Sequence, residues 1–308
     1  MRIVMLGGSG FVGQVLARRL VRDGHTVVVP TRNRSDHREA ALQPGVELRE
    51  GDVHDGDWLG RVLSGADAAI NLVGILNEPG IGGAGGRGFE RAHVQLTRTL
   101  IAACGRAGVS RLLQMSALNA GRGASHYLRT RGEAEMAVKA SALRWTILRP
   151  SVIFGRGDGL FCRFADLLKL SPVMPLAGSS ARFQPVAVED VAEAFVRALQ
   201  REDSIGQTYE LGGPEVVTLA EIVRRSAHWL GLRRLIVPMP AIVGWVQAAA
   251  FGLWPFANKP LSLDNFRSLA IDSVVGAEDG LSRLGIAKTA MAQTVPHYLR
   301  PRAPTIGG

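Results

Sequence analysis

Cysteine and lysine are scarce in this chain of 308 residues, and the scarcity of cysteine excludes whole classes of protein. The two cysteines, Cys104 and Cys162, lie in apolar stretches and are too few for a disulfide framework. We therefore expect a protein of the reducing cytoplasm. Neither a Cys-x-x-Cys nor a His-Glu-x-x-His motif occurs, so the sequence predicts no metal site.

Only 4 of the 36 basic residues are lysine, and the other 32 are arginine. The net charge of +9 favours anionic partners, such as phosphorylated cofactors or anionic lipid. The arginines are scattered and are not interleaved with aromatic residues, so we predict no nucleic-acid partner. A generally basic, solvated surface is the simpler interpretation of this charge.

We also expect neither a secretion signal nor a membrane span. Met1 leads directly into an apolar strand, without the basic, apolar and cleavage regions of a signal peptide. The stretch 235–258 carries no charge, but its three prolines and two glycines argue against a continuous spanning helix. We expect a helix over 241–253, which either forms the core of a small lobe or contacts a membrane surface or protein partner through 241–256. The predicted location is cytoplasmic, with peripheral contact on the inner face of the membrane as the variant.

Apolar runs alternate with amphipathic stretches over the first two hundred residues. They predict strands at 2–8, 25–32, 46–53, 67–76, 110–118 and 144–155, and helices at 11–24, 58–66, 89–108 and 127–141. This alternation is typical of an α/β protein with a doubly wound (Rossmann) parallel sheet, here followed by a small, mostly helical C-terminal lobe. We assign 1–150 and 183–213 to the nucleotide-binding domain, and 151–182 and 214–308 to the lobe.

Local signals refine this outline. The pattern Thr218-x-x-Glu221 predicts a capping box at the start of a helix. Asp190 is expected to cap a helix that follows a turn near 186. Six of the eleven residues in 78–88 are glycine, which predicts a mobile loop.

A glycine-rich turn joins the first predicted strand to the first helix. Gly7, Gly10 and Gly13 would let the backbone approach a pyrophosphate, and the helix N-terminus supplies free N–H donors. The intervening Ser9, and Phe11 and Val12 at the helix start, complete the expected cradle. The alternative is a tight turn without a ligand, which the strand–turn–helix context disfavours.

The end of the second strand indicates which dinucleotide is bound. No acidic residue occurs over 25–35, and Thr31, Arg32 and Arg34 stand where an NAD site carries a carboxylate. A guanidinium binds a 2′-phosphate through two hydrogen bonds, so NADP(H) is the predicted cofactor and NAD(H) the alternative, should both arginines point to solvent. Asp52 and Val53 would lie near the adenine. The segment Asn71, Leu72, Val73 and Gly74 would place backbone beside the cofactor.

The motifs GGSGFVG, GDV and NLVG, a serine after the fifth strand and a Tyr-x-x-x-cation occur in this order, which resembles the short-chain dehydrogenase/reductase superfamily. NLVGIL, YLRTRGEAE, ILRPSVIFGRGD, RFADLL and RFQPVAVEDVAEA are similar to its atypical group that includes the NADPH-binding accessory subunit of respiratory complex I and its bacterial relatives. The resemblance covers about residues 1–215. It implies that Pro150 and Val152 border the nicotinamide.

The resemblance also implies a catalytic set of Ser116, Tyr127 and Arg131. In the superfamily the tyrosine exchanges a proton during hydride transfer, a serine orients the substrate, and a lysine four residues after the tyrosine assists it. Arg131 departs from that pattern. Either an arginine-rich lineage replaced lysine and kept activity, or the site lost its catalytic role and keeps the cofactor as a structural part.

Two functions follow from these alternatives. The first is an NADPH-dependent oxidoreductase acting on a hydrophobic carbonyl or quinone-like substrate, in a pocket lined by aromatic and apolar residues that could equally be lobe core: Phe161, Phe164, Met174 and Phe183. The second is a weakly active or inactive NADPH-bound assembly protein related to the complex I subunit. Sugar-nucleotide epimerase chemistry ranks third. His93 is expected to be a buried, hydrogen-bonded histidine rather than part of a proton relay.

Overall fold

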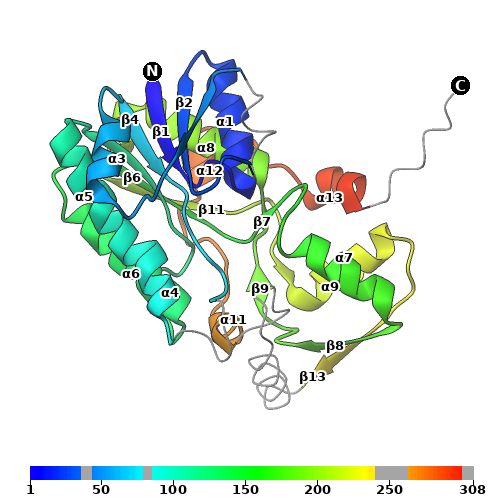
Figure 1. Cartoon of the computed structure of the whole chain (residues 1–308). Helices are drawn as coiled ribbons and strands as arrows, with labels where there is room; N and C mark the ends of the chain where they lie inside the picture. Colours follow the sequence, from blue (N-terminus) through cyan, green and yellow to red (C-terminus); the bar gives the residue numbers. More distant parts are fainter. Residues whose placement is uncertain (36–43, 79–84, 240–262, 300–308) are drawn as a thin grey trace, which may run out of the picture.

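The structure is a computed structural model that describes residues 1–35, 44–78, 85–239 and 263–299 (Figure 1). The expected helix over 241–253 lies outside the described residues, as do residues 79–84 of the glycine-rich segment.

A seven-stranded sheet forms the centre of the nucleotide-binding domain. Its order is β11-β6-β5-β4-β1-β2-β3, and every neighbouring pair is parallel. The strands are β1 (Arg2–Leu6), β2 (Thr26–Thr31), β3 (Val46–Glu50), β4 (Ala68–Asn71), β5 (Arg111–Met115), β6 (Arg144–Pro150) and β11 (Gln207–Leu211). The order reverses between β1 and β4, which is where open parallel sheets bind ligands at their carboxyl edge.

Helices cover both faces of the sheet (Figure 1). One face carries α1 (Phe11–Arg22), α8 (Val188–Gln200) and α12 (Gly280–Arg283), and the other carries α3 (Gly56–Leu63), α5 (Leu96–Ala107) and α6 (His126–Lys139). Alternate residues of β1 pack into the two cores: Ile3 and Met5 join the first, Val4 and Leu6 the second. The predicted doubly wound α/β fold is confirmed.

Two predicted elements are interrupted. The helix expected over 89–108 starts as α4 (Arg87–Phe89), passes through a π-helical turn (Glu90–Gln95) and only then becomes α5. The strand expected over 144–155 ends at Pro150, and β7 (Ile153–Phe154) pairs instead with β10 (Val186–Ala187). Because Gly86 and Arg87 already lie at a helix start, the mobile loop expected over 78–88 was wrong for the described residues beyond 84.

The C-terminal lobe packs α7 (Phe161–Leu170), α9 (Leu219–Trp229) and α13 (Met291–Leu299) around Phe154, Ile222 and Val295, on the right of Figure 1. Two short parallel strands, β8 (Val173–Ala177) and β13 (Leu235–Met239), close one side of it. The remaining elements are β9 (Arg182–Phe183), β12 (Val217–Thr218), a 3-10 turn (Glu202–Ser204) and α11 (Leu263–Ser268).

The capping box at Thr218 and Glu221 is confirmed. The cap expected from Asp190 was wrong, because α8 begins at Val188 and the Asp190 carboxylate accepts the backbone N–H and hydroxyl of Thr289 instead. Within the described residues, no helix has both the length and the apolar character needed to cross a membrane.

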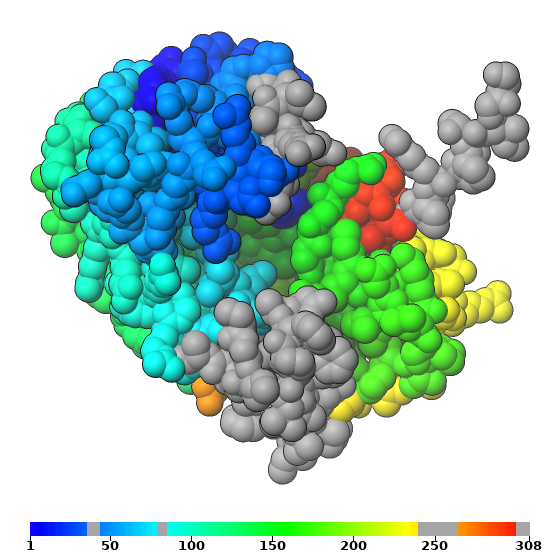
Figure 2. All heavy atoms as spheres, viewed as in Figure 1, coloured from blue at the N-terminus to red at the C-terminus, as the bar shows by residue number. Residues whose placement is uncertain are grey.

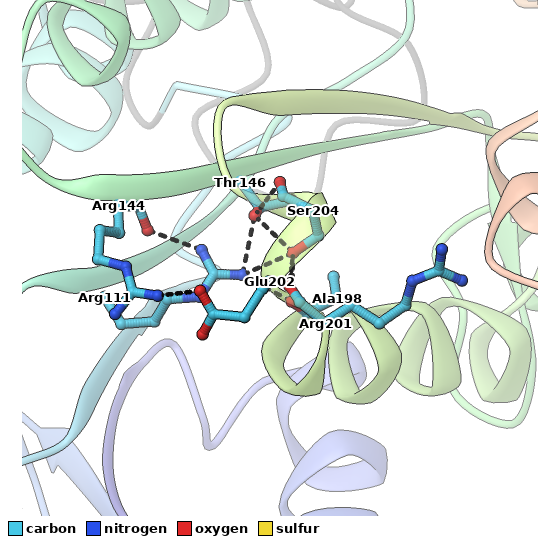
Figure 3. Close-up of polar contacts among 7 residues, drawn as sticks. All are labelled: Arg111, Arg144, Thr146, Ala198, Arg201, Glu202 and Ser204. Atoms are coloured by element: carbon cyan, nitrogen blue, oxygen red, sulfur yellow. Dashed lines mark hydrogen bonds and ion pairs between the residues drawn. The ribbon is translucent and has the colours of Figure 1, made fainter.

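A buried arginine closes the amino edge of the sheet, opposite the predicted site (Figure 3). The Arg111 guanidinium donates to the carbonyl of Arg144 at 2.7 Å, and to Thr146 Oγ1, Ser204 Oγ and the carbonyl of Ala198 at 2.9, 2.9 and 2.6 Å. Burial, with some repulsion from Arg144, lowers the pKa of Arg111 to about 10, so it keeps its charge at neutral pH. Arg111 therefore joins β5, β6 and the end of α8 without any link to the carboxyl edge.

Candidate cofactor and catalytic site

The glycine-rich turn forms a tight cradle between β1 and α1. Gly7 has a φ of +76°, a conformation that suits glycine, and Gly10 is the N-cap of α1. A Cβ added to Gly13 would lie 2.5 Å from the Cα of Gly8 and would overlap the carbonyl oxygen of Gly7. The first turn of α1 can pack against the loop only because residue 13 has no Cβ. Gly10 makes no side-chain cap, so the first N–H groups of α1 stay available for an anion.

The end of β2 carries the predicted specificity residues. Thr31 is buried and its hydroxyl donates to the carbonyl of Asn33 at 3.1 Å, whereas Arg32 and Arg34 are exposed. Within the described residues the Arg32 side chain has no hydrogen bond or ion pair, so it is free to bind a phosphate. Glu50, which pairs with Thr31 across the sheet, accepts the backbone N–H of Arg34 at 3.0 Å. Sequence reasoning considered only the acids of the second strand and missed this carboxylate.

The loops after β3 and β4 are shaped by their own polar side chains. Asp52 is exposed, accepts the N–H of His54 at 2.9 Å and lies before the half-buried Val53. Asn71 is buried: its Oδ1 accepts the N–H of Val73 at 3.1 Å, and its Nδ2 donates to Gln114 at 3.0 Å. The Asn71 side chain is thus engaged by the protein and fixes the backbone at Val73.

Ser116 follows β5 at the same edge of the sheet. Its backbone N–H donates to the carbonyl of Leu148 at 2.7 Å, which fixes the residue beside β6. Its hydroxyl is buried and has no partner in the described part of the chain. A buried polar group without a partner is uncommon, because it is costly unless a bound molecule or water satisfies it.

Tyr127 and Arg131 lie on the same side of α6. The Arg131 Cζ is 5.5 Å from the centroid of the Tyr127 ring. The Tyr127 ring meets Phe89 and His93 edge-on, at centroid distances of 6.1 and 5.6 Å. Its hydroxyl makes no hydrogen bond to the described residues. The serine hydroxyl, the tyrosine hydroxyl and the cation therefore come from elements that meet at one edge of the sheet.

The Arg131 guanidinium has an additional task that the sequence did not indicate. Its Nη1 donates to the carbonyls of Val73 and Met115 at 3.2 and 3.0 Å and so joins the chain after β4 to the end of β5. Its Nε is buried without a partner in the described structure. A Cβ added to Gly74 would overlap Nη2, so the glycine at 74 makes room for the guanidinium.

His93 is buried under the Tyr127 ring in a fixed tautomer. The N–H of Ile75 donates to its Nε2 at 3.2 Å, so the ring proton sits on Nδ1, which contacts Thr130 Oγ1 at 2.8 Å. Thr130 in turn donates to the carbonyl of His126 at 2.8 Å. Burial, assisted by the charge of Arg131, lowers the pKa of His93 to about 2. His93 is thus a neutral, hydrogen-bonded support, as the sequence favoured.

A distant carboxylate holds the N-terminus of α6. Asp264 of α11 accepts the backbone N–H groups of His126 and Tyr127, at 2.6 and 3.0 Å. The adjacent cap, Ser125, accepts the N–H of Leu128 at 3.1 Å and is recognisable from sequence. Asp264 is separated from Tyr127 by more than a hundred residues and carries no local signal that could have revealed this contact.

The segment from α11 onward runs along the site. Asn265 donates to Asn77 beyond β4 at 2.9 Å, and Asn119 beyond β5 donates to the carbonyl of Asp272 at 2.9 Å. The Ser151 hydroxyl, between Pro150 and Val152, donates to the carbonyl of Ser273 at 2.8 Å. The loops that follow three strands are therefore tied to one segment of the C-terminal part of the chain.

The four residues proposed to line an apolar pocket pack into the lobe. Phe161 belongs to its first core cluster and Met174 to its second, and both are buried. Phe164 and Phe183 are partly buried against these clusters. The structure therefore favours lobe core for Phe161 and Met174, while Phe164 and Phe183 keep some exposed surface. Figure 2 shows the surface hollowed between the blue and cyan atoms of the N-terminal half and the green atoms of the lobe.

These residues fit a dinucleotide. The glycine cradle has no room for a Cβ at Gly13, α1 offers free N–H groups, and Ser116 presents a buried hydroxyl without a protein partner. Among the described residues, no group of three or more His, Cys, Asp or Glu side chains could hold a metal ion. The glycine turn and the free N–H groups of α1 can therefore accept a phosphate-bearing cofactor.

Comparison with known proteins agrees with this geometry. Residues 7–202 match the family model described as NAD(P)H-binding. The chain is 34% identical over 286 residues to subunit 9 of the NADH dehydrogenase [ubiquinone] 1 alpha subcomplex of Arabidopsis thaliana, covering 88% of this chain and 70% of that protein. It is 28% identical over 243 residues to a ceramide reductase of Caulobacter vibrioides, covering 77% and 73%.

Solved structures share the fold. The NADPH complex of an NADPH-dependent quinone oxidoreductase from Escherichia coli superposes with a TM-score of 0.76 at 20% identity, covering 96% of this chain and 99% of that one. A dTDP-glucose 4,6-dehydratase from Streptomyces venezuelae gives 0.75 at 20% identity, covering 97% and 96%. The chain belongs to the NAD(P)H-binding, atypical short-chain dehydrogenase/reductase superfamily, in the group that contains the complex I accessory subunit, and is an oxidoreductase-like protein.

Proposed function

We propose that the chain binds NADPH at the carboxyl edge of the sheet and reduces a hydrophobic carbonyl or quinone-like compound. The observation that carries this proposal is the buried Ser116 hydroxyl, which has no hydrogen-bond partner among the described residues and follows Met115, whose carbonyl accepts Arg131. A hydroxyl in that position is suited to orient a substrate oxygen. The hydrophobic character of the substrate is supported by the relative named ceramide reductase.

The chemistry requires a hydride and a proton. NADPH, when bound, supplies the hydride to the carbonyl carbon. Tyr127 donates its phenolic proton to the carbonyl oxygen while Ser116 holds that oxygen by a hydrogen bond. The positive charge of Arg131, 5.5 Å from the tyrosine ring, stabilises the phenolate until water returns a proton.

NADPH is preferred over NADH in this proposal because of Arg32. Its guanidinium is exposed at the end of β2 and would form a bidentate contact with the 2′-phosphate. Glu50 lies on the neighbouring strand, but it is engaged by the backbone N–H of Arg34. We place the substrate between residues 1–150 and 183–213 on one side and the lobe, 151–182 and 214–308, on the other. A cytoplasmic location accords with the free Cys104 and Cys162.

A second candidate is a protein that keeps NADPH as a structural part and acts through a protein partner. The observation that favours it is the engagement of Arg131 by two backbone carbonyls. A guanidinium that ties β4 to β5 is less free to follow the cofactor ribose than the lysine usual in this superfamily. The similarity to complex I subunits makes a respiratory assembly the partner class to test.

One experiment distinguishes these functions. Purified protein is denatured, the released nucleotide is identified, and NADPH oxidation is followed with a panel of hydrophobic aldehydes, ketones and quinones. The variants are Tyr127→Phe and Arg131→Lys, and Arg129→Lys is the matched control because it lies on the same helix but is exposed and paired with Glu133. Turnover that Tyr127→Phe abolishes and Arg129→Lys preserves supports the reductase.

The other outcomes are equally informative. Retained NADPH with no oxidation, in the wild type and in Arg131→Lys, supports the structural cofactor and refutes the reductase. Equal affinities for NADPH and NADH would refute the role assigned to Arg32.

A further inference from the structure

Exposed large apolar side chains gather at one place on the lobe. Eight such residues are exposed in the described part of the chain; three of them belong to the two-stranded sheet, and a fourth is the last residue of α7, just before β8. Leu170 is 82% exposed, Val173 43%, Leu235 63% and Val237 39%. Single exposed apolar residues are normal, whereas a cluster of them marks an interaction surface.

The strand register explains why these residues share a face. In the parallel pair, Leu235 lies opposite Val173 and Val237 lies opposite Pro175. The alternate residues Met174 and Leu176 point the other way and are buried in the second lobe cluster. We call the outward strand residues, Val173, Pro175, Leu235 and Val237, together with the exposed Leu170 at the end of α7, the lobe face. In the described structure no further layer covers the outward side of the two strands.

Cations stand at the end of the lobe face where both strands begin. Arg233 and Arg234 directly precede β13, and Lys169 lies at the end of α7. The two strand starts are held together, because Leu235 N–H donates to the carbonyl of Pro172 at 2.9 Å and Arg234 Nε donates to that of Leu168 at 2.6 Å. Lys169 pairs with Asp166, at 3.1 Å, on the exposed side of α7. The apolar face is therefore bordered by an excess of positive charge.

We propose that the lobe face docks on the surface of an anionic bilayer, with its apolar side chains in the interface and its cations among the lipid headgroups. Charge complementarity supports lipid as the occupant, since a net charge of +9 and the bordering cations attract an anionic surface. Edge-to-edge pairing with a second copy is disfavoured, because Pro175 and Pro238 interrupt the N–H groups of β8 and β13. Shallow docking needs no membrane-spanning helix.

The test is flotation of the whole protein with vesicles of phosphatidylglycerol and phosphatidylcholine, or of phosphatidylcholine alone, followed by size-exclusion chromatography with light scattering. One variant combines Leu170→Ser with Leu235→Ser. Its matched control combines Met136→Ser with Val216→Ser, which are also exposed but lie elsewhere. Arg233→Glu is compared with Arg49→Glu, whose side chain is 56% exposed on β3.

We expect binding to anionic vesicles only. The partition coefficient should fall at least tenfold in the double serine variant, and by about fivefold or more in Arg233→Glu, since one charge near the surface contributes about that factor. Both controls should stay within twofold of wild type. Absence of binding to anionic vesicles would overturn the proposal, as would equal losses in variants and controls. A dimer that only the double serine variant dissociates, without vesicle binding, would assign the lobe face to a second copy instead.

Discussion

Replacing Asp264 by alanine should destabilise the N-terminus of α6, the helix that carries Tyr127, although Asp264 is distant from this helix in the sequence. The carboxylate accepts two backbone N–H groups, at 2.6 and 3.0 Å, at the first turn of α6. Alanine removes both acceptors and the negative charge that opposes the helix dipole. The donors at His126 and Tyr127 would then lose their partners.

The magnitude follows from burial. A hydrogen bond to a charged group contributes about 1.5–3 kcal/mol, and a helix cap about 0.5–2 kcal/mol. Asp264 is 9% exposed, so water replaces it poorly, and we expect a loss of about 3 kcal/mol in the free energy of unfolding or of local opening. This corresponds to amide exchange at 126 and 127 that is about a hundredfold faster, and to a Tm lower by roughly 5–10 °C.

Hydrogen exchange resolved to α6, with calorimetry, measures both effects. Asp272→Ala is the matched control, since Asp272 also accepts two hydrogen bonds, from Arg182 N–H and Nε at 2.9 and 3.0 Å, but its side chain is 47% exposed. Asp272→Ala should cost less than about 1 kcal/mol. Asp264→Asn keeps one acceptor oxygen, so its loss in the free energy of unfolding should lie between those of Asp264→Ala and Asp272→Ala. Equal losses for the two alanine variants, or unchanged exchange at 126 and 127, would refute the reasoning.

Three further changes have defined outcomes. Gly13→Ala should abolish NADPH binding, measured by cofactor fluorescence, because its Cβ collides with the backbone of Gly7 and Gly8; retained affinity would refute the cradle. The pKa of His93 is lowered to about 2, so the neutral histidine contributes fully to the free energy of unfolding above about pH 6.5. This contribution is progressively lost as the pH falls toward 2. Between pH 7.5 and 5.5, the free energy of unfolding measured with urea should fall by about 1.4 kcal/mol more in the wild type than in His93→Gln. Parallel losses in the two proteins would contradict this. Arg111→Met removes one donor from four acceptors, three of them in buried hydrogen bonds, and should cost about 3–5 kcal/mol by the same assay, which a loss below about 1 kcal/mol would contradict.

The central sheet was predictable because its signals are local. The central strands contain apolar runs, as in β1, where residues facing either layer are buried. The glycine spacing and the order of Ser116, Tyr127 and Arg131 are also local patterns, so their positions at one edge followed from the fold.

What the sequence missed depends on contacts between distant residues. Asp264 reaches α6 from a short helix that no periodicity marks, and Glu50 lies on a neighbouring strand. The π-helical turn interrupts an otherwise uniform helical pattern. The strands β8 and β13 are five residues long and contain proline, which weakens any strand signal, although their pairing creates the exposed lobe face.

Arg131 shows most clearly how structure changes the meaning of a substitution. Considered in the sequence alone, arginine in place of lysine is either drift in an arginine-rich chain or a sign of lost catalysis. The guanidinium, however, fills space that only glycine at 74 provides, and it joins the backbone at Val73 and Met115. Both bonds come from Nη1, so a lysine ammonium could donate to both carbonyls only if its shorter side chain reached the same point. The guanidinium therefore packs against Gly74 and joins the chain after β4 to the end of β5, so Arg131→Lys changes this packing as well as the cation beside Tyr127.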